Sequence, residues 1–221
     1  MTSSSTTGRR ALAAYSAAPR GDRLHVWVRW RTCPFASLEA HVPTSGRILD
    51  VGCGHGLFPI LLALSEPDRS VTGTDVDAAK LVVAGEAATS AGVAITFEPA
   101  GDGVPQGPWD AITIVDVLYL LGHEGAHALL CAAAGELAPG GTLLVKEIDE
   151  RPLWKYRLAR VQEWLATRVL RITEGSGVNF LPPADIAATL ERTGLHVERV
   201  RLDQGRLHPH HLLIGHRPTA G

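Results

Sequence analysis

Short apolar runs and longer segments of helical composition alternate along the central part of the chain. Five runs have the length and apolar content of buried strands, and they are residues 47–51, 70–75, 93–97, 111–115 and 142–147. Three segments that separate them have helix composition, and they are residues 57–64, 77–91 and 124–137. With 221 residues, 45% of them hydrophobic, the chain is long enough to bury the core of one α/β domain.

The two ends of the chain have different patterns. Residues 1–10 are rich in Ser and Thr, and we expect a disordered tail there. Residues 11–45 favour two or three helices, although the apolar and polar side chains that alternate over residues 24–31 are also typical of a strand. Near the other end, residues 195–202 and 208–216 predict a closing pair of strands.

A basic amphipathic segment lies between the fifth predicted strand and this closing pair. Residues 151–171 carry an apolar stripe at helical spacing, with six basic residues against one acidic residue. The simplest interpretation of such charges is a solvated helix face. A basic cover over an acidic or amphipathic substrate, or contact with an anionic membrane surface, is the alternative.

Charge and cysteine usage argue against several classes of protein. The formal net charge of −2 and the pI near 6.5 disfavour a general nucleic-acid binder, which is usually basic. Cys33, Cys53 and Cys131 are too scattered for a zinc pair or a disulfide framework, so we expect a reduced, cytoplasmic setting. No apolar run reaches the roughly 18 residues of a membrane span.

The most informative stretch follows the first predicted strand. Asp50-x-Gly52-x-Gly54-x-Gly56 joins this strand to an apolar helix that begins near Leu57. Glycines let backbone N–H groups approach a ligand, and a helix N-terminus favours negative charge, so the stretch predicts a nucleotide-type site. A dinucleotide fingerprint requires a glycine where Leu57 stands. The stretch instead resembles motif I of the class I S-adenosylmethionine (SAM) methyltransferases, in which the turn passes under the methionine part of SAM and the acid helps to hold its amino group.

Further landmarks of the same family follow in the same order. Asp75 ends the second strand and resembles the acid that binds the ribose, while Gly101-Asp102 resembles the pair that receives the adenine amino group. Asp116 stands where the family has its motif between SAM and substrate, and residues 137–147 match its LxPGGxLLxxE pattern. The resemblance implies SAM as the cofactor, S-adenosylhomocysteine (SAH) as the product, and a set of cofactor-binding residues. These are Asp50, Gly52, Cys53, Gly54, Gly56, Asp75, Val76, Gly101, Asp102, Asp116 and Val117.

The family's fold sets the expected architecture. It is a three-layer Rossmann-like α/β sheet of seven strands in the order 3-2-1-4-5-7-6, with strand 7 antiparallel. Residues 11–221 would form a single domain, with a helical cap over residues 11–45 and a helical, substrate-covering insertion after strand 5, over residues 151–180. The residues expected to bind substrate are Tyr15, Trp27, Arg31, Glu147, Trp154 and Lys155. Tryptophans that simply pack the cap onto the sheet are the alternative.

The residues after strand 4 bear on the methyl acceptor. The amino-methyltransferases of DNA, RNA and some proteins have Asn/Asp-Pro-Pro-aromatic there, whereas this chain has Asp116-Val117-Leu118-Tyr119. This departure argues against a nucleobase amino group, and we expect an enzyme that methylates a small molecule, with oxygen favoured over nitrogen or carbon. We expect no nucleic-acid partner, and a monomer or a homodimer.

A hydroxyl acceptor would require a general base. The candidates are His208, His210, His211, Tyr119 and His123. We expect no metal, because the sequence contains no dense carboxylate cluster. Two alternatives remain: a SAM-binding protein of this fold without methyl transfer, and a nicotinamide-dependent oxidoreductase, which Leu57 and the closing hairpin oppose.

Overall fold

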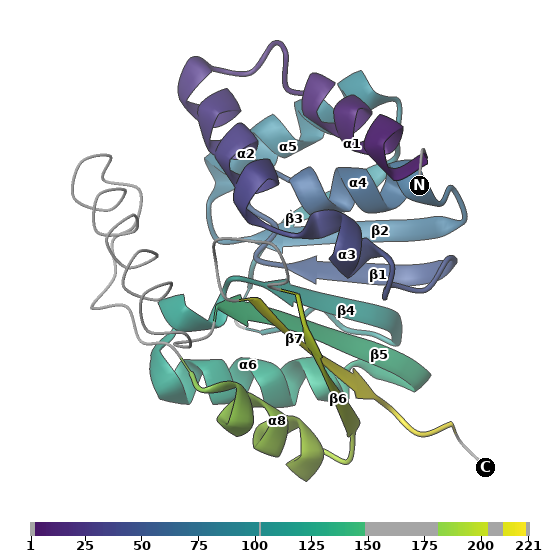
Figure 1. Cartoon of the computed structure of the whole chain (residues 1–221), viewed down its shortest axis with the longest axis vertical. Helices are drawn as coiled ribbons and strands as arrows, with labels where there is room; N and C mark the ends of the chain where they lie inside the picture. The colour runs from purple at the N-terminus through teal and green to yellow at the C-terminus, as the bar shows by residue number, and fades with distance from the viewer. Residues whose placement is uncertain (1–2, 102, 149–180, 203–209, 220–221) are drawn as a thin grey trace.

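The computed structural model describes residues 3–101, 103–148, 181–202 and 210–219 (Figure 1). The helices are α1 (Ser3–Ala13), α2 (Arg20–Thr32), α3 (Phe35–Glu39), α4 (Leu57–Ser65), α5 (Ala78–Ala91), the 3₁₀ helix η1 (Leu118–Leu120), α6 (Gly122–Gly135) and α8 (Pro183–Arg192). The strands are β1 (Gly46–Val51), β2 (Arg69–Asp75), β3 (Ile95–Pro99), β4 (Trp109–Val115), β5 (Leu137–Ile148), β6 (His196–Arg201) and β7 (His210–His216).

The seven strands form one sheet in the order β3-β2-β1-β4-β5-β7-β6. Strands β1 to β5 are paired in parallel, and β7 runs antiparallel to both β5 and β6. The predicted strand order and the antiparallel last strand are therefore confirmed.

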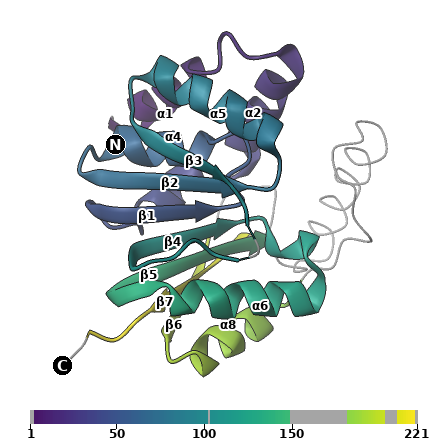
Figure 2. The same ribbon diagram turned by 180° about the vertical axis from the view of Figure 1, so that it is seen from behind.

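Helices cover both faces of the sheet. The cap helices α1 to α3, with α4 and α5, pack on one face, and α6 and α8 pack on the other (Figure 2). The central strands are apolar on both sides: every side chain from Ala111 to Val115 in β4 is buried. Parallel strands covered on both faces have this continuous apolar sequence, which explains why β4 is easily recognised.

The parallel register brings three loops to one edge of the sheet. Val51 at the end of β1 lies opposite Thr74 of β2 and Ile114 of β4, and Val115 lies opposite Lys146 of β5. The segments that follow β1, β2 and β4 therefore lie together with α2, at the left-hand edge in Figure 1. Ligands of open α/β sheets bind at this edge, outside the carboxyl ends of the strands.

The N-terminal region is helical further upstream than the sequence suggests. The expected disordered tail, residues 1–10, is wrong for most of its length, because α1 begins at Ser3. Gly8 of α1 packs against the indole of Trp30, and Ala11 is fully buried. Residues 20–32 form a helix, so the strand interpretation of residues 24–31 is also wrong. Packing against α2 and α4 compensates for the weak helix propensity of the Ser/Thr-rich segment.

A buried arginine anchors the end of the cap to the sheet. Arg69 at the start of β2 donates hydrogen bonds to the carbonyls of Val42 and Pro43, at 3.0 and 2.7 Å, and pairs with Glu39 of α3 at 2.8 Å. The cap is thus tied to the far end of the strands by a charged side chain that is satisfied on several sides. Within the described ranges, no helix is long and apolar enough to cross a membrane.

Candidate active site

The glycine turn after β1 forms the floor of the candidate site. Gly52, Gly54 and Gly56 have φ values of 72°, 56° and 76°, in the left-handed region that favours glycine. A Cβ at Gly56 would lie 2.7 Å from Ala84 and 2.9 Å from Phe97, whereas a Cβ at Gly54 would meet nothing within 4 Å. Gly56 is therefore required for packing, and Gly54 leaves open space above the turn. The N-terminus of α4 follows immediately at Leu57.

Asp75 holds this turn from the end of β2. One carboxylate oxygen accepts a hydrogen bond from the backbone N–H of Gly54 at 2.8 Å, and the other accepts from the N–H of Asp77 at 2.9 Å. Each carboxylate oxygen has a second lone pair, so Asp75 keeps acceptor capacity for the two hydroxyls of a ribose. The side chain of Val76, which comes next, is 88% exposed.

Asp50 lies beneath the turn, at the end of β1. Its carboxylate is buried and accepts a hydrogen bond from the Thr113 hydroxyl at 2.5 Å. Burial raises the pKa of Asp50 to about 7, although the bond from Thr113 and the charge of Arg29 oppose the shift. A cation placed over the turn would favour the ionised form, so Asp50 is suited to an ammonium group.

Asp116 at the end of β4 joins three elements. Its backbone has φ 57°, a left-handed conformation that is rare outside glycine. Its carboxylate pairs with Arg29 of α2 at 2.6 Å and with Lys146 of β5, whose side chain is only 1% exposed. Burial alone would raise the pKa of Asp116, but the two cations lower it well below its usual range. We name Arg29, Asp116 and Lys146 the cap–sheet ion cluster.

Glu147 has a different environment on the opposite side of β5. Its carboxylate is buried and accepts hydrogen bonds from the backbone N–H groups of Val117 and Leu118, at 3.0 and 2.8 Å. Burial and the nearby charge of Asp116 raise the pKa of Glu147 to about 8, against these backbone donors. The contacts described for Glu147 thus support the segment after β4, rather than reach toward a substrate.

The cap residues expected to bind substrate make different contacts in the structure. The hydroxyl of Tyr15 is buried and donates to the carbonyl of His55 in the glycine turn at 2.6 Å. Trp27 is 52% exposed and lines a cavity of about 570 Å³ between α1 and α2, together with Tyr15. Arg31 lies over the Trp27 ring, 5.6 Å from its centroid. Among the cap arginines, Arg29 rather than Arg31 reaches the strand ends.

Sequence reasoning missed Arg29, Lys146 and His55. Arg29 follows the buried Val26 by three residues and precedes the buried Cys33 by four, which is helical spacing for one inward face. This phase was available in the sequence, but the apolar-polar alternation of residues 24–31 obscured it. Nothing local in the sequence distinguishes Lys146 from a surface lysine.

The remaining candidates are distributed around the same edge. Gly101 is exposed after β3, Val117 lies close to Gly52, Tyr119 is partly buried in η1, and His123 is exposed at the start of α6. His211 lies opposite Glu147 in the pairing of β5 with β7. Asp102, Trp154, Lys155, His208 and the insertion over residues 151–180 lie outside the described residues, as does the side chain of His210.

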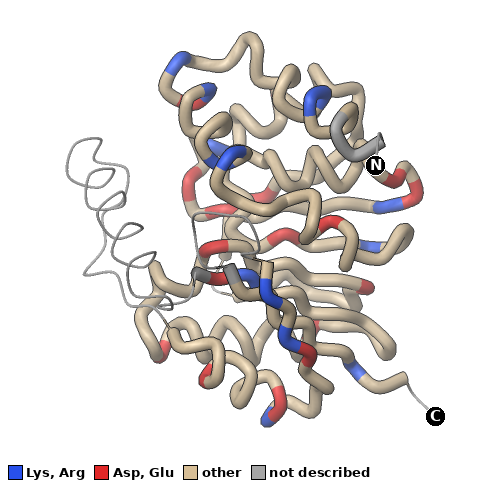
Figure 3. The backbone as a smooth tube through the Cα atoms, in the orientation of Figure 1, with Lys and Arg blue, Asp and Glu red and all other residues tan. Residues whose placement is uncertain are grey.

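Charge is concentrated where the parallel strands end. Acidic positions, red in Figure 3, gather at this edge of the sheet, with the basic positions of α2 close by. Across the described ranges, no group of three or more His, Cys, Asp and Glu side chains could hold a metal ion. The arrangement can hold a cofactor with a ribose and a cationic group at the glycine turn, and it presents a cation, Arg29, beside it.

Fold and site define a class: a nucleotide-type cofactor site on a seven-stranded sheet with an antiparallel last strand. A family model described as a methyltransferase domain matches residues 29–200, and the chain belongs to this methyltransferase family. It is similar to a ubiquinone biosynthesis O-methyltransferase of Xylella fastidiosa, with 33% identity over 168 residues, 74% of this chain and 66% of that protein. The chain thus spans slightly less than two thirds of the length of this curated relative.

Solved structures show the same fold. An O-methyltransferase family protein from Burkholderia thailandensis superposes with a TM-score of 0.71 at 19% identity, over 90% of this chain and 59% of that one. A magnesium protoporphyrin IX methyltransferase from Synechocystis with bound SAH superposes with a TM-score of 0.65 at 19% identity, over 83% of this chain and 81% of that one.

Proposed function

We propose that this protein is an enzyme that binds SAM and transfers its methyl group to an oxygen atom of a small molecule. The observation that carries the proposal is the glycine turn: it is open above Gly54 and is held by the Asp75 carboxylate through the Gly54 N–H. Membership of the methyltransferase family, and the SAH bound to a structural neighbour, support SAM as the cofactor. Leu57 and the antiparallel β7 oppose a nicotinamide-dependent oxidoreductase.

The residues of the chain fit the parts of SAM. Asp75 would accept hydrogen bonds from the ribose hydroxyls, with the exposed Val76 beside the adenine. The backbone of the turn, from Gly52 to Gly56, would lie under the methionine part. Asp50 would stabilise the amino group of the cofactor. The remaining cofactor candidates, Cys53, Gly101, Asp102, Asp116 and Val117, follow from the family resemblance.

When bound, SAM supplies a methyl carbon activated by its sulfonium. In the proposed transfer this methyl would pass to the acceptor oxygen and SAH would be the other product, so the turn and the cap would contribute to the rate mainly by holding the acceptor in line with the methyl. A hydroxyl acceptor also gives up a proton to a base, for which Tyr119, His123 and His211 are the described candidates. A carboxylate acceptor has no proton to lose and needs only a cation nearby, and Arg29, which pairs with Asp116 through one guanidinium nitrogen, would be that cation.

The same features favour an acidic or amphipathic acceptor. Arg29 contributes positive charge at the strand ends, and Leu120 and Leu121 expose apolar surface after β4, at 49% and 44%. We also infer a reduced, cytoplasmic setting, because the described cysteines, Cys33, Cys53 and Cys131, form no disulfide. A nucleic-acid partner does not fit the charge of −2.

Mass spectrometry of acceptor mixtures tests the proposal. Incubating the protein with SAM and a panel of phenols, carboxylic acids and amines should yield a product heavier by one methylene, together with an equal amount of SAH. The methyl group should be on oxygen. Binding of SAM without transfer to any member of a broad panel would favour a SAM-binding protein without turnover. Methylated amines alone would contradict the choice of oxygen.

A further inference from the structure

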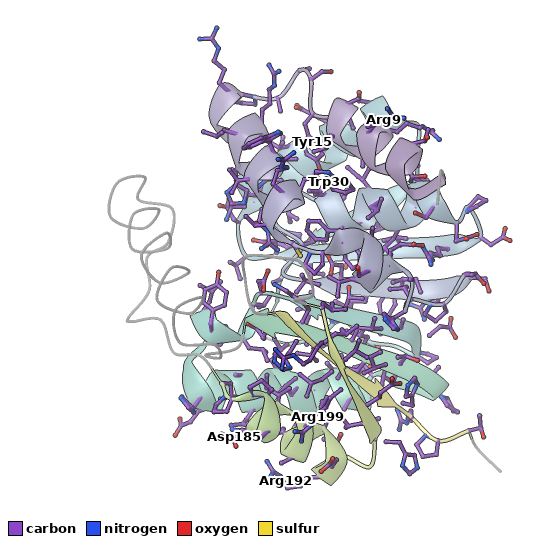
Figure 4. All side chains as sticks on the ribbon, viewed as in Figure 1. Arg9, Tyr15, Trp30, Asp185, Arg192 and Arg199 are labelled. Carbon is purple, nitrogen blue, oxygen red and sulfur yellow. The ribbon has the colours of Figure 1, made fainter. Side chains whose placement is uncertain are left out.

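Two histidines meet where the cap covers the glycine turn. The rings of His25 of α2 and His55 of the turn are in tilted contact, with ring centroids 4.9 Å apart and an interplanar angle of 41°. His55 is 8% exposed, and its carbonyl accepts the hydrogen bond from the buried Tyr15 hydroxyl. In Figure 4, Tyr15 and Trp30 lie within the cap formed by α1 and α2. The histidine pair is thus part of the contact between α2 and the turn.

The hydrogen bonds of His55 suit a neutral ring. Its Nε2 lies 3.3 Å from a carboxylate oxygen of Asp22, so the tautomer with hydrogen on Nε2 donates to that acid. Its Nδ1 is buried, and no described residue offers it a hydrogen bond. The neutral ring leaves a lone pair on Nδ1 without a donor, whereas protonation would place a charged N–H donor there without an acceptor, which is more destabilising.

The charges that face the pair do not favour a doubly protonated state. Around His25, burial, His55, Arg29 and Lys80 of α5 lower the pKa to about 4, against the opposing effect of Asp22. Burial is also the main cause that lowers the pKa of His55, reinforced by Lys80 and opposed by Asp22 and Asp77. Two imidazolium rings in contact would in addition repel one another.

We propose that His25 and His55 are positioning residues that hold α2 on the glycine turn only while both rings are neutral. An imidazole in the loosened cap has an ordinary pKa near 6.5, so it takes up a proton more readily than one in the docked cap. Docking is therefore fully favoured above about pH 6.5 and weakens progressively as the pH falls toward 4. Because the turn is the proposed SAM site, SAM affinity should fall with it; this consequence rests on the proposed function.

Hydrogen–deuterium exchange of the cofactor-free protein tests the pH-dependent docking of α2 without assuming SAM binding. The measurement compares the amides of residues 24–32 at pH 7.5 and pH 5.5, corrected for the intrinsic exchange rate. In the parent, the His25 shift alone should increase local opening about tenfold at the lower pH. His25→Gln and His55→Gln keep a side-chain donor but do not titrate in this range, so the double variant should lose most of this increase. His41→Gln, on an exposed residue before β1, is the matched control and should behave as the parent.

The outcomes distinguish pH-dependent docking of α2 from a purely structural role of the two histidines. Equal opening at both pH values in the parent, or the same pH dependence in the double variant, would overturn the proposal. If the double variant does not fold, His25→Gln alone decides, because the expected increase is calculated from His25. Calorimetry at the same two pH values gives SAM affinity separately. Absence of SAM binding at both pH values would count against the proposed function. The exchange result would still decide whether the docking of α2 depends on pH.

Discussion

The buried carboxylates at the strand ends differ in protonation because their neighbours differ. Asp116 is held ionised by Arg29 and Lys146. Glu147, on the neighbouring strand, has no cation of its own at hydrogen-bond distance among the described residues, and burial beside Asp116 keeps it protonated at neutral pH. Asp50 titrates near pH 7, where a cationic ligand decides its state. One edge of the sheet thus holds three buried acids whose protonation at neutral pH differs.

Glu147 makes a testable contribution to pH-dependent stability. A carboxyl whose folded pKa is raised stabilises the fold below its unfolded value of 4.5, and this stability is lost as the pH rises toward 8. Glu147→Gln resembles the protonated form and does not titrate. The free energy of unfolding of this variant, relative to the parent, should therefore increase by about 1–4 kcal/mol between pH 5 and pH 8. Urea denaturation at several pH values measures this difference.

The control for this change is Glu124→Gln, on an exposed residue in the first turn of α6. Its difference from the parent should stay constant over the same range. A constant difference for Glu147→Gln as well would show that Glu147 is ionised in the folded protein, contrary to our interpretation.

Asp75 is the residue on which the cofactor assignment depends most. Asp75→Ala should weaken SAM binding by about 1–3 kcal/mol, because ribose hydroxyls are left without acceptors and Gly54 loses its anchor. Asp68→Ala, on an exposed acid that precedes β2 at the other end of the strand, is the control and should bind SAM as the parent does. An unchanged dissociation constant for Asp75→Ala would refute the ribose assignment.

At the scale of elements, α2 connects the cap to the sheet. It contributes Arg29 to the cap–sheet ion cluster and His25 to the contact with the glycine turn. The sequence allowed a helix here but did not settle its phase, and for this reason Arg31 was expected at the site and Arg29 was not. The buried Val26 and the ion pair of Arg29 with Asp116, 87 residues away, together show which face of α2 points inward.

The cap–sheet ion cluster predicts a compensating pair of substitutions. Lys146→Met removes a fully buried partner of Asp116 and should lower the free energy of unfolding by about 2–4 kcal/mol. Adding Asp116→Asn should recover part of this loss, because the charge left behind is removed and Arg29 is partly exposed to water. Urea denaturation of both variants measures the coupling.

The control is Lys80→Met, which breaks a partly exposed ion pair with Asp77 and should cost less than about 1 kcal/mol. If the double variant is as unstable as the sum of its single variants, Asp116 and Lys146 are not coupled and the cluster does not link β4 to β5.

At the scale of the whole molecule, the sheet was predictable and its cap contacts were not. The strands carry continuous apolar runs, so the local sequence pattern predicted the sheet. Asp50, the glycines and Asp75 lie within 26 residues, so the proposed cofactor turn was also predictable from the local sequence. Residues 3–10 of the first helix were assigned to a tail because their Ser/Thr-rich sequence has weak helix propensity, and the contact of Gly8 with Trp30 was not visible in the sequence. Arg29, Asp116 and Lys146 come from distant segments, and a single sequence carries no signal that pairs them.

The family also explains which parts of the site could be expected. The residues proposed to contact SAM lie in short motifs at the glycine turn and the strand ends, whereas those proposed for the acceptor come from the cap, the segment after β4 and β7. Glu147 illustrates the difference: it ends a recognisable motif, yet its described bonds go to the backbone of Val117 and Leu118. Identity of the acceptor therefore depends on chemistry that the motifs do not encode.

Calorimetric titration of the purified chain with SAM, SAH and NADH tests the central claim most directly. We predict saturable binding of SAM and of SAH at one site per chain, competition between the two, and no heat from NADH beyond dilution. Weaker SAM binding by Asp75→Ala in the same experiment would place this site at the glycine turn. No saturable binding of SAM or SAH by the folded parent, or saturable binding of NADH instead, would contradict the account.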